Sequence, residues 1–228
     1  MELISFLLRV VAFPLLVALP TVNATPAISL PYPFEADKLY DLKIDQKIAP
    51  NEEVRKRANA YRVYLALTPP GWGTGPVCWL AKEVDLDVTQ VNVTIPADAA
   101  PDQSRIRIST ALLKKGAPRG MGFSYSSRTT LVGANATWSQ KELDGRNHID
   151  AEEVSCWAYG CARTCQVTYY TTKDEEDGPI GDKAYACVKQ CAKDLNPRSD
   201  GAMNGMSMSR ILAVVVMIGS IHMVLGVL

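Results

Sequence analysis

Histidine is scarce in this chain, and a net charge is missing altogether. Only two histidines occur among 228 residues, and 24 lysines and arginines balance 24 aspartates and glutamates. His222 lies in a terminal hydrophobic stretch, which leaves His148 for the rest of the chain. Because a metal site or a nucleophilic triad usually needs histidine, we expect no catalytic residues, no metal and no cofactor. A neutral chain also lacks the basic face that attracts nucleic acid, so we expect no such partner.

Long hydrophobic runs are missing from the interior and occur only at the two ends. The first is a short apolar core over residues 10–19, preceded by a single arginine. Small residues follow at Val22 and Ala24, which is the spacing that a signal peptidase recognises. We predict a secretory signal peptide over residues 1–24 and a mature chain that begins at Thr25.

The second apolar run covers residues 211–228, and no lysine or arginine follows it. A polar spacer over 203–210 precedes it, after the small residues at 199–202. This order is typical of a glycosylphosphatidylinositol (GPI) anchor signal, whereas a membrane span is usually flanked by cytosolic lysine or arginine. We predict a GPI signal over residues 197–228 and a place on the outer face of the plasma membrane or in a cell wall. A type I transmembrane anchor is the alternative.

The lipid attachment residue needs small neighbours on its C-terminal side. Asp200 meets this condition and is our predicted lipidation site. Ser199 meets it too, while Asn204 is followed by one glycine and then by a methionine.

The predicted mature chain contains six cysteines. Cysteines in an oxidising lumen form lasting disulfides, and an even number predicts three bridges. The six positions are Cys78, Cys156, Cys161, Cys165, Cys187 and Cys191. Two Asn-x-Thr sequons, at Asn92 and Asn135, predict N-glycosylation and mark the chain independently as secretory.

The middle of the chain consists of short segments with alternating or continuous apolar residues. Glycine and proline separate these segments, which predicts β-strands joined by turns. They cover residues 61–67, 77–81, 84–88, 91–95, 105–108 and 121–125, with a bulge or bend expected near residues 89–90. Helical patterns between the strands are lacking, which argues against a parallel α/β sheet. We therefore predict a mainly-β fold with an Ig-like antiparallel β-sandwich over residues 61–149.

A proline-rich, polar segment over residues 25–60 precedes the sandwich and predicts an irregular lead-in. It ends near Lys56-Arg57, which fits a solvated charged turn or a dibasic processing site.

The period of the pattern changes after residue 149. Asp150 to Glu153 is acidic, as the start of a helix often is. Two later segments place cysteines four residues apart, on one face of a helix: Cys161 with Cys165, and Cys187 with Cys191. We predict a helical hairpin over residues 150–196.

Antiparallel packing of these two helices brings the first cysteine opposite the last. This geometry predicts the bridges Cys161–Cys191 and Cys165–Cys187. Cys78 and Cys156 are then left, and their bridge would join the sandwich to the hairpin.

Two other chemistries compete with this interpretation. The paired cysteines could hold zinc, but three residues separate each pair instead of the usual two. The abundant carboxylates, with Asp85 and Asp87 on one strand face, leave a two-carboxylate glycosidase as an alternative. We favour solvated carboxylates, and so no enzymatic activity.

Tryptophan offers the best ligand candidate. Trp79 and Trp157 each follow a cysteine of the inter-domain bridge, so we expect both to pack beside it. Trp72 lies in a glycine-rich loop, and we predict that it binds ligand.

Several of these motifs also occur together in a known group of proteins. A signal peptide, the motifs Pro69-Pro70-Gly71-Trp72, Arg105-Ile106-Arg107-Ile108 and Phe123-Ser124-Tyr125-Ser126, and a GPI signal follow one another. The order resembles fungal GPI-anchored surface proteins with an N-terminal Ig-like or fibronectin-like module. The resemblance implies a structural or binding role in cell-wall β-1,6-glucan assembly, with a wall glycan or a surface protein as partner. This chain differs in lacking a Ser/Thr-rich stalk.

Overall fold

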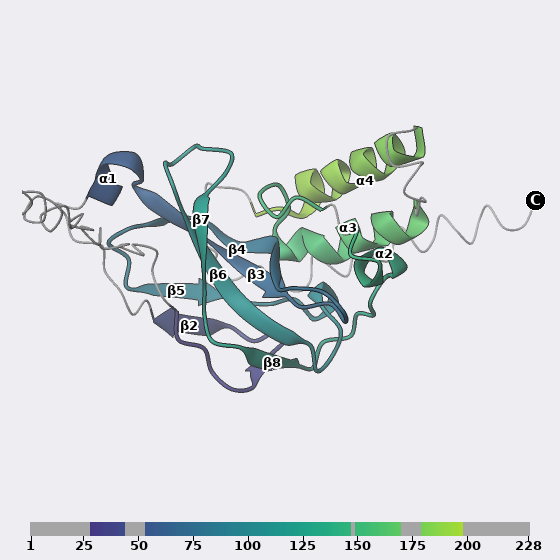
Figure 1. The fold of residues 1–228 in the computed structure, drawn as a ribbon, viewed down its shortest axis with the longest axis horizontal. Coiled ribbons are helices and arrows are strands. Elements are labelled where there is room, and N and C mark those ends of the chain that lie inside the picture. The colour runs from purple at the N-terminus through teal and green to yellow at the C-terminus, as the bar shows by residue number, and fades with distance from the viewer. Residues whose placement is uncertain (1–27, 44–52, 147–148, 170–178, 198–228) are drawn as a thin grey trace, which may run out of the picture.

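A computed structural model describes residues 28–43, 53–146, 149–169 and 179–197 (Figure 1). The signal peptide, His148, Asp200 and the C-terminal apolar run lie outside these ranges. No helix within the described ranges is long and apolar enough to cross a membrane.

The centre of the described structure is a six-stranded sheet, curled like half of a barrel (Figure 1). Its main path runs β1 (Phe34–Glu35), β8 (Thr129–Val132), β6 (Arg105–Leu113), β3 (Ala60–Leu67) and β4 (Gly75–Asp85). A sixth strand, β7 (Met121–Tyr125), pairs with β6. β3 is antiparallel to both of its neighbours, which agrees with the predicted antiparallel pairing of short strands.

β3 is the centre of the sheet, and all eight of its residues are buried. Successive side chains of a strand point to opposite faces. Tyr61, Val63, Leu65 and Leu67 belong to the main hydrophobic core on the inner face. Tyr64 belongs to a smaller cluster on the outer face, together with Trp79 and Ala111. Both faces of the sheet are therefore covered at its centre.

The inner face is closed by a two-stranded antiparallel ribbon, β2 (Tyr40–Lys43) with β5 (Gln90–Val93). Leu42, Val91 and Val93 from this ribbon share the main core with the inner face of β3. The short elements α1 (Glu53–Arg57) and η1 (Ala97–Ala99) precede β3 and β6. The mainly-sheet character is thus confirmed, but this second layer of two strands does not confirm an Ig-like sandwich.

Three helices follow the sheet: α2 (Gln140–Leu143), α3 (Cys156–Thr168) and α4 (Pro179–Leu195). Helix α3 begins after Ser155, whose hydroxyl accepts a hydrogen bond from the Ala158 amide at 3.2 Å. The predicted start at residues 150–153 is wrong, because these residues form a turn. A hydroxyl cap satisfies a free amide of the first turn, so Ser155 sets the boundary.

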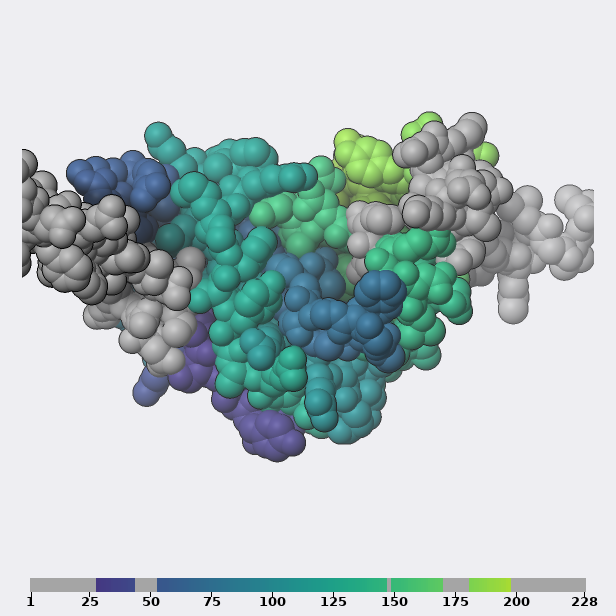
Figure 2. Space-filling model, in the orientation of Figure 1, coloured from purple at the N-terminus to yellow at the C-terminus, as the bar shows by residue number. Residues whose placement is uncertain are grey.

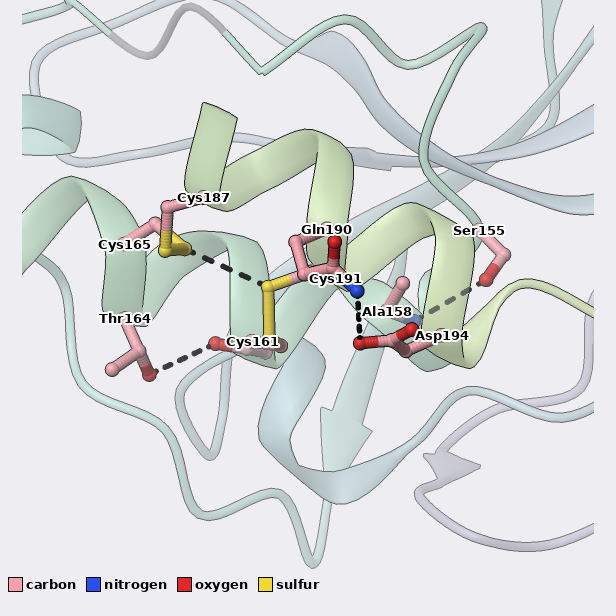
Figure 3. Close-up of a disulfide and its surroundings, with 10 residues drawn as sticks. Ser155, Ala158, Cys161, Thr164, Cys165, Cys187, Gln190, Cys191 and Asp194 are labelled. Carbon is pink, nitrogen blue, oxygen red and sulfur yellow. Dashed lines mark hydrogen bonds between the residues drawn. A yellow bond between two sulfur atoms is a disulfide. The ribbon is translucent and has the colours of Figure 1, made fainter. Parts of the chain in front are cut away.

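Three disulfides connect the helices to each other and to the sheet, and two of them join α3 to α4 (Figure 3). Cys161 bonds to Cys191 and Cys165 to Cys187, as expected for antiparallel helices with cysteines at i and i+4. The two bridges are adjacent, with Sγ atoms of Cys165 and Cys191 3.6 Å apart.

The third disulfide joins Cys78 of β4 to Cys156 at the start of α3. These are the three pairs that the sequence predicts. Trp79 does not pack beside this bridge as expected: Cys78 belongs to the main core, whereas Trp79 points to the other face of β4 and is buried with Tyr64 and Ala111. The Trp79 amide donates to the Val154 carbonyl at 3.0 Å.

A buried ion pair fixes α2 against α3. The Arg163 guanidinium donates two hydrogen bonds to the Glu142 carboxylate, at 3.0 and 2.7 Å. The same carboxylate accepts from the amide and hydroxyl of Ser139, the cap of α2, both at 2.8 Å. Because both charges are paired and hydrogen-bonded, the pair can remain in the interior.

Candidate ligand-binding surface

The outer face of the sheet carries one row of side chains that crosses four strands. The strand register pairs Tyr64 with both Trp79 and Ser109, and Ser109 with Tyr125. Paired residues point to the same face of a sheet. These four side chains, which we call the outer-face row, therefore run from β4 to the free side of β7.

One end of the outer-face row is covered and the other is open. Ala151 packs against the cluster of Tyr64 and Trp79, which closes the β4 end. At the β7 end Phe123 meets the Tyr64 ring edge-on, with centroids 5.4 Å apart. Phe123 and Tyr125 are nevertheless 46% and 37% exposed. Strand β7 therefore presents aromatic rings to solvent from a rigid support.

A polar network lies under the closed end. The Arg62 side chain is 1% exposed and forms an ion pair with Glu152. Glu152 also accepts from the Tyr64 hydroxyl at 2.7 Å and from the Gly120 amide at 3.0 Å. Burial, with the hydrogen bond to Glu152 second, raises the pKa of the Tyr64 phenol well above its usual value. The hydroxyl thus stays protonated and serves as a donor.

A hollow of about 350 Å³ opens beside this network. Charged side chains of both signs line it, together with the turn at 116–118: Arg62, Lys82, Glu83, Glu152 and Glu153. Glu83 accepts from the Gly116 amide at 2.9 Å, so it too has a structural partner. The contacts of Glu152 and Glu83 brace the turn and the 149–155 segment against β3 and β4.

Trp72 lies in the turn between β3 and β4 and is 50% exposed. Its indole Nε1 donates to the Leu143 carbonyl at the end of α2, at 2.8 Å. The ring rests on Gly145, where an added Cβ would approach ring atoms to 2.3–2.5 Å. The hydroxyls of Thr68 and Thr74 share a hydrogen bond at 2.7 Å across the base of the loop. The ring is thus held by the protein while half of its surface remains in solvent.

Trp72 and β7 belong to the same side of the molecule. In Figure 2 the blue atoms of the β3–β4 turn and the teal atoms of the β6–β7 region both face the viewer. The sequence pointed to Trp72 but missed Phe123 and Tyr125 as exposed rings. A signal was present, since Phe123-Ser124-Tyr125 alternates and therefore places both rings on one face.

The predicted glycosylation sites lie on accessible strands and loops. Asn92 is exposed in β5 between the buried Val91 and Val93, which is the orientation that the sequence predicts. Asn135 is also exposed, in the segment after β8. Both side chains are thus accessible for modification.

The carboxylates considered for catalysis each form an ion pair at the surface. Asp85 pairs with Lys115 at 2.5 Å, and Asp87 with Arg55 at 2.6 Å. Both aspartates are largely exposed, as solvated carboxylates are.

The cysteines considered for zinc are occupied. Across the part of the chain that the structure describes, three metal-ligating side chains gather only at Cys161, Cys165 and Cys191. Their sulfurs are in disulfides and offer no thiolate to a metal.

Comparison with protein-family models, with curated proteins and with solved structures finds no match.

Proposed function

We propose that this chain is a non-enzymatic, GPI-anchored protein of the cell surface or cell wall, and that its sheet region binds glycan. The observation that carries the proposal is the Trp72 ring, which is half exposed yet fixed by Leu143 and Gly145. An exposed aromatic ring that the protein already holds in place loses little conformational freedom on binding, so it is well suited to contact a partner. A sugar ring has an apolar C–H face that stacks on such a surface. A protein at the cell surface is the alternative partner for the Trp72 ring.

Binding to a glycan array, followed by titration of the best glycan, tests this proposal. We expect Trp72→Ala to weaken binding at least tenfold. Tyr185→Ala is a matched control, because Tyr185 is an exposed aromatic residue on α4, in another part of the molecule. Equal loss in both variants, or no loss in Trp72→Ala, would contradict the role of Trp72.

The same secreted fragment should leave the glycans intact. A hydrolysis assay on the array's positive glycans separates binding from the glycosidase alternative. Release of reducing ends that Asp85→Asn or Asp87→Asn abolishes would establish the glycosidase instead.

The anchor and the glycans belong to the same proposal. Phosphatidylinositol-specific phospholipase should release the protein from cells, and purified protein that retains residues 211–228 would overturn the anchor. Enzymatic deglycosylation should lower the mass by two N-glycans, at Asn92 and Asn135. An unmodified Asn92 peptide would contradict the first of them.

The Ig-like arrangement of residues 61–149 and its link to wall β-1,6-glucan assembly also remain part of the proposal. Antiparallel pairing of β3 with β4 and β6 supports the arrangement. Loss of alkali-insoluble β-1,6-glucan after gene deletion, restored by the secreted sheet region held at the surface, would support the wall role. An unchanged amount of β-1,6-glucan after deletion would contradict the wall role.

A further inference from the structure

Arginines gather on the open part of the outer sheet face. Arg105 and Arg107 are two residues apart on β6, so both point to one face. Arg107 alternates with Ser109, which belongs to the outer-face row. β6 pairs Arg105 with Thr130 of β8, and the exposed Arg128 lies one residue before the start of β8. Arg105 and Arg107 thus share the face of Tyr125, and Arg128 lies in the short segment that joins β7 to β8.

These three arginines differ from the other arginines of the sheet and α3. Arg62, Arg119 and Arg163 each form an ion pair with a carboxylate. Within residues 28–43, 53–146, 149–169 and 179–197, no carboxylate forms an ion pair with Arg105, Arg107 or Arg128. Their positive charge is therefore not neutralised by the described part of the chain.

Two polar atoms beneath this surface also lack partners. The Nε of Arg107 and the Oγ of Ser109 are buried, and neither has a hydrogen-bond partner among the described residues. Ser109 is fully buried. An unpaired buried polar atom is unfavourable, so we expect water or another polar group to complete these two.

The ring of Tyr125 adjoins the same groups. Burial raises the pKa of the Tyr125 phenol, and the nearby positive charge of Arg107 opposes that rise. Tyr125 therefore lies within electrostatic reach of Arg107 while 37% of it remains exposed. Phe123, two residues earlier on β7, adds a second exposed ring.

We infer that this cationic–aromatic face, formed by Arg105, Arg107, Arg128, Phe123 and Tyr125, binds an acidic glycan, a polysaccharide that carries carboxylate, sulfate or phosphate. The inference rests on the proposed function and names the class of glycan. Guanidinium groups bind such oxyanions through two parallel hydrogen bonds, and the rings take the apolar faces of the sugars. The unpaired arginines suit the acidic groups of such a polysaccharide, and the exposed rings suit the apolar faces of its sugars.

Matched pairs of probes test the charge requirement. Dextran sulfate is compared with dextran, and polygalacturonate with its methyl ester, using the glycosylated, disulfide-intact protein. We expect at least tenfold tighter binding to the charged member of each pair. Because exposed charges are screened by salt, that binding should weaken steeply between 50 and 500 mM salt, roughly the range over which the Debye length falls severalfold.

Variants locate the binding on this face. We expect the triple variant R105Q/R107Q/R128Q to lose at least tenfold in affinity for dextran sulfate, and Arg128→Glu alone to lose severalfold. Arg119→Gln is the control, because Arg119 is an exposed arginine that already pairs with Asp150. Arg128→Glu changes one exposed side chain, so it keeps the test valid if the triple variant does not fold. Unchanged binding in Arg128→Glu, or equal loss in Arg119→Gln, overturns the inference.

The outcomes also separate this inference from the proposed function. If neutral glycans bind through Trp72 and the charged probes bind no better, the inference is wrong and the function stands. If no glycan of either kind binds, both fail. Binding of polyglutamate through the same arginines, without any glycan binding, would assign the face to an acidic protein segment and overturn both.

Discussion

In the sheet, β3 is buried along its whole length, whereas α4 buries only Val188 and Cys191 among its described side chains. The two regions are also joined to the molecule differently. β3 exchanges backbone hydrogen bonds with a strand on each side, while α4 is held to α3 by two disulfides. Asn196 adds hydrogen bonds to the Ser155 amide and the Glu153 carbonyl, both at 2.8 Å.

This difference shows that one chain uses two sources of stability. Burial of apolar surface holds the sheet, and it is lost cooperatively when the core opens. Disulfides hold α4, chiefly by limiting the unfolded chain, so the helix needs little buried surface. Helix α3 joins the two regions, because it buries Tyr159 and Ala162 in the main core and carries three of the cysteines.

The largest effect should come from the ion pair that makes α3 part of the sheet region. Glu142→Ala leaves the Arg163 guanidinium buried without its carboxylate, which should lower the free energy of unfolding by about 3–5 kcal/mol. Urea denaturation followed by tryptophan fluorescence measures this. Glu35→Ala is the control, because its pair with Lys38 is solvent-exposed and should contribute little to stability. Equal effects would mean that α3 unfolds apart from the sheet.

The second prediction separates α4 from the sheet. Replacing Cys161 and Cys191 together by serine removes one bridge and should cost about 2–4 kcal/mol. We expect faster hydrogen exchange in residues 179–197, with the amides of β3 unchanged. Equal acceleration in β3 would show that the two regions form one cooperative unit.

A third prediction concerns the site and leaves both regions folded. Gly145→Ala adds a Cβ where φ is +71° and where the Trp72 ring is in the way. The strain should cost about 1–2 kcal/mol, and glycan binding should weaken as the ring is displaced. Gly133→Ala is the matched control, because φ is +77° there but the space is open. If both variants bind equally well, contact with Gly145 does not position Trp72.

The smallest effect should come from the surface of the sheet region. Asp87→Asn removes an ion pair with Arg55 in which the aspartate side chain is 79% exposed. We expect a change of under about 1 kcal/mol in the free energy of unfolding, and less at high salt. A larger loss would mean that surface charge also contributes to the stability of this region.

Local patterns predicted β3 to β7 and the disulfide pairs. They missed β8, and they also missed β1 and β2, which lie in the segment 25–60 that we expected to be irregular. The alternation at 61–67 and the cysteines at i and i+4 depend on neighbouring residues alone, which is why they could be read from the sequence. The turn after Asp85 was not predicted. The apolar alternation continues through Leu86 and Val88, yet β4 ends at Asp85 and the Val88 amide turns back to the Asp85 carbonyl.

The start of α3 and the binding surface depend on residues far apart in sequence. In the sequence Glu152 looks like a residue of a first helical turn. In the structure its carboxylate pairs instead with Arg62 and Tyr64, which lie on β3. Trp72 rests on Gly145, and Tyr64 meets Tyr125 across Ser109 only through the strand register. Such contacts follow from the tertiary fold, which a local pattern does not contain.

The disulfides also determine how the protein would carry a mechanical load. Tension applied between Pro197 and a point before Cys78 crosses from Cys191 to Cys161, and then from Cys156 to Cys78, through covalent bonds. The loops closed by these bridges, with sequence separations of 30 and 78, bear none of it. β6, β7 and β8 lie inside the longer loop. A pull along this path could therefore extend the chain only outside these loops, and the cationic–aromatic face would keep its covalent frame under force.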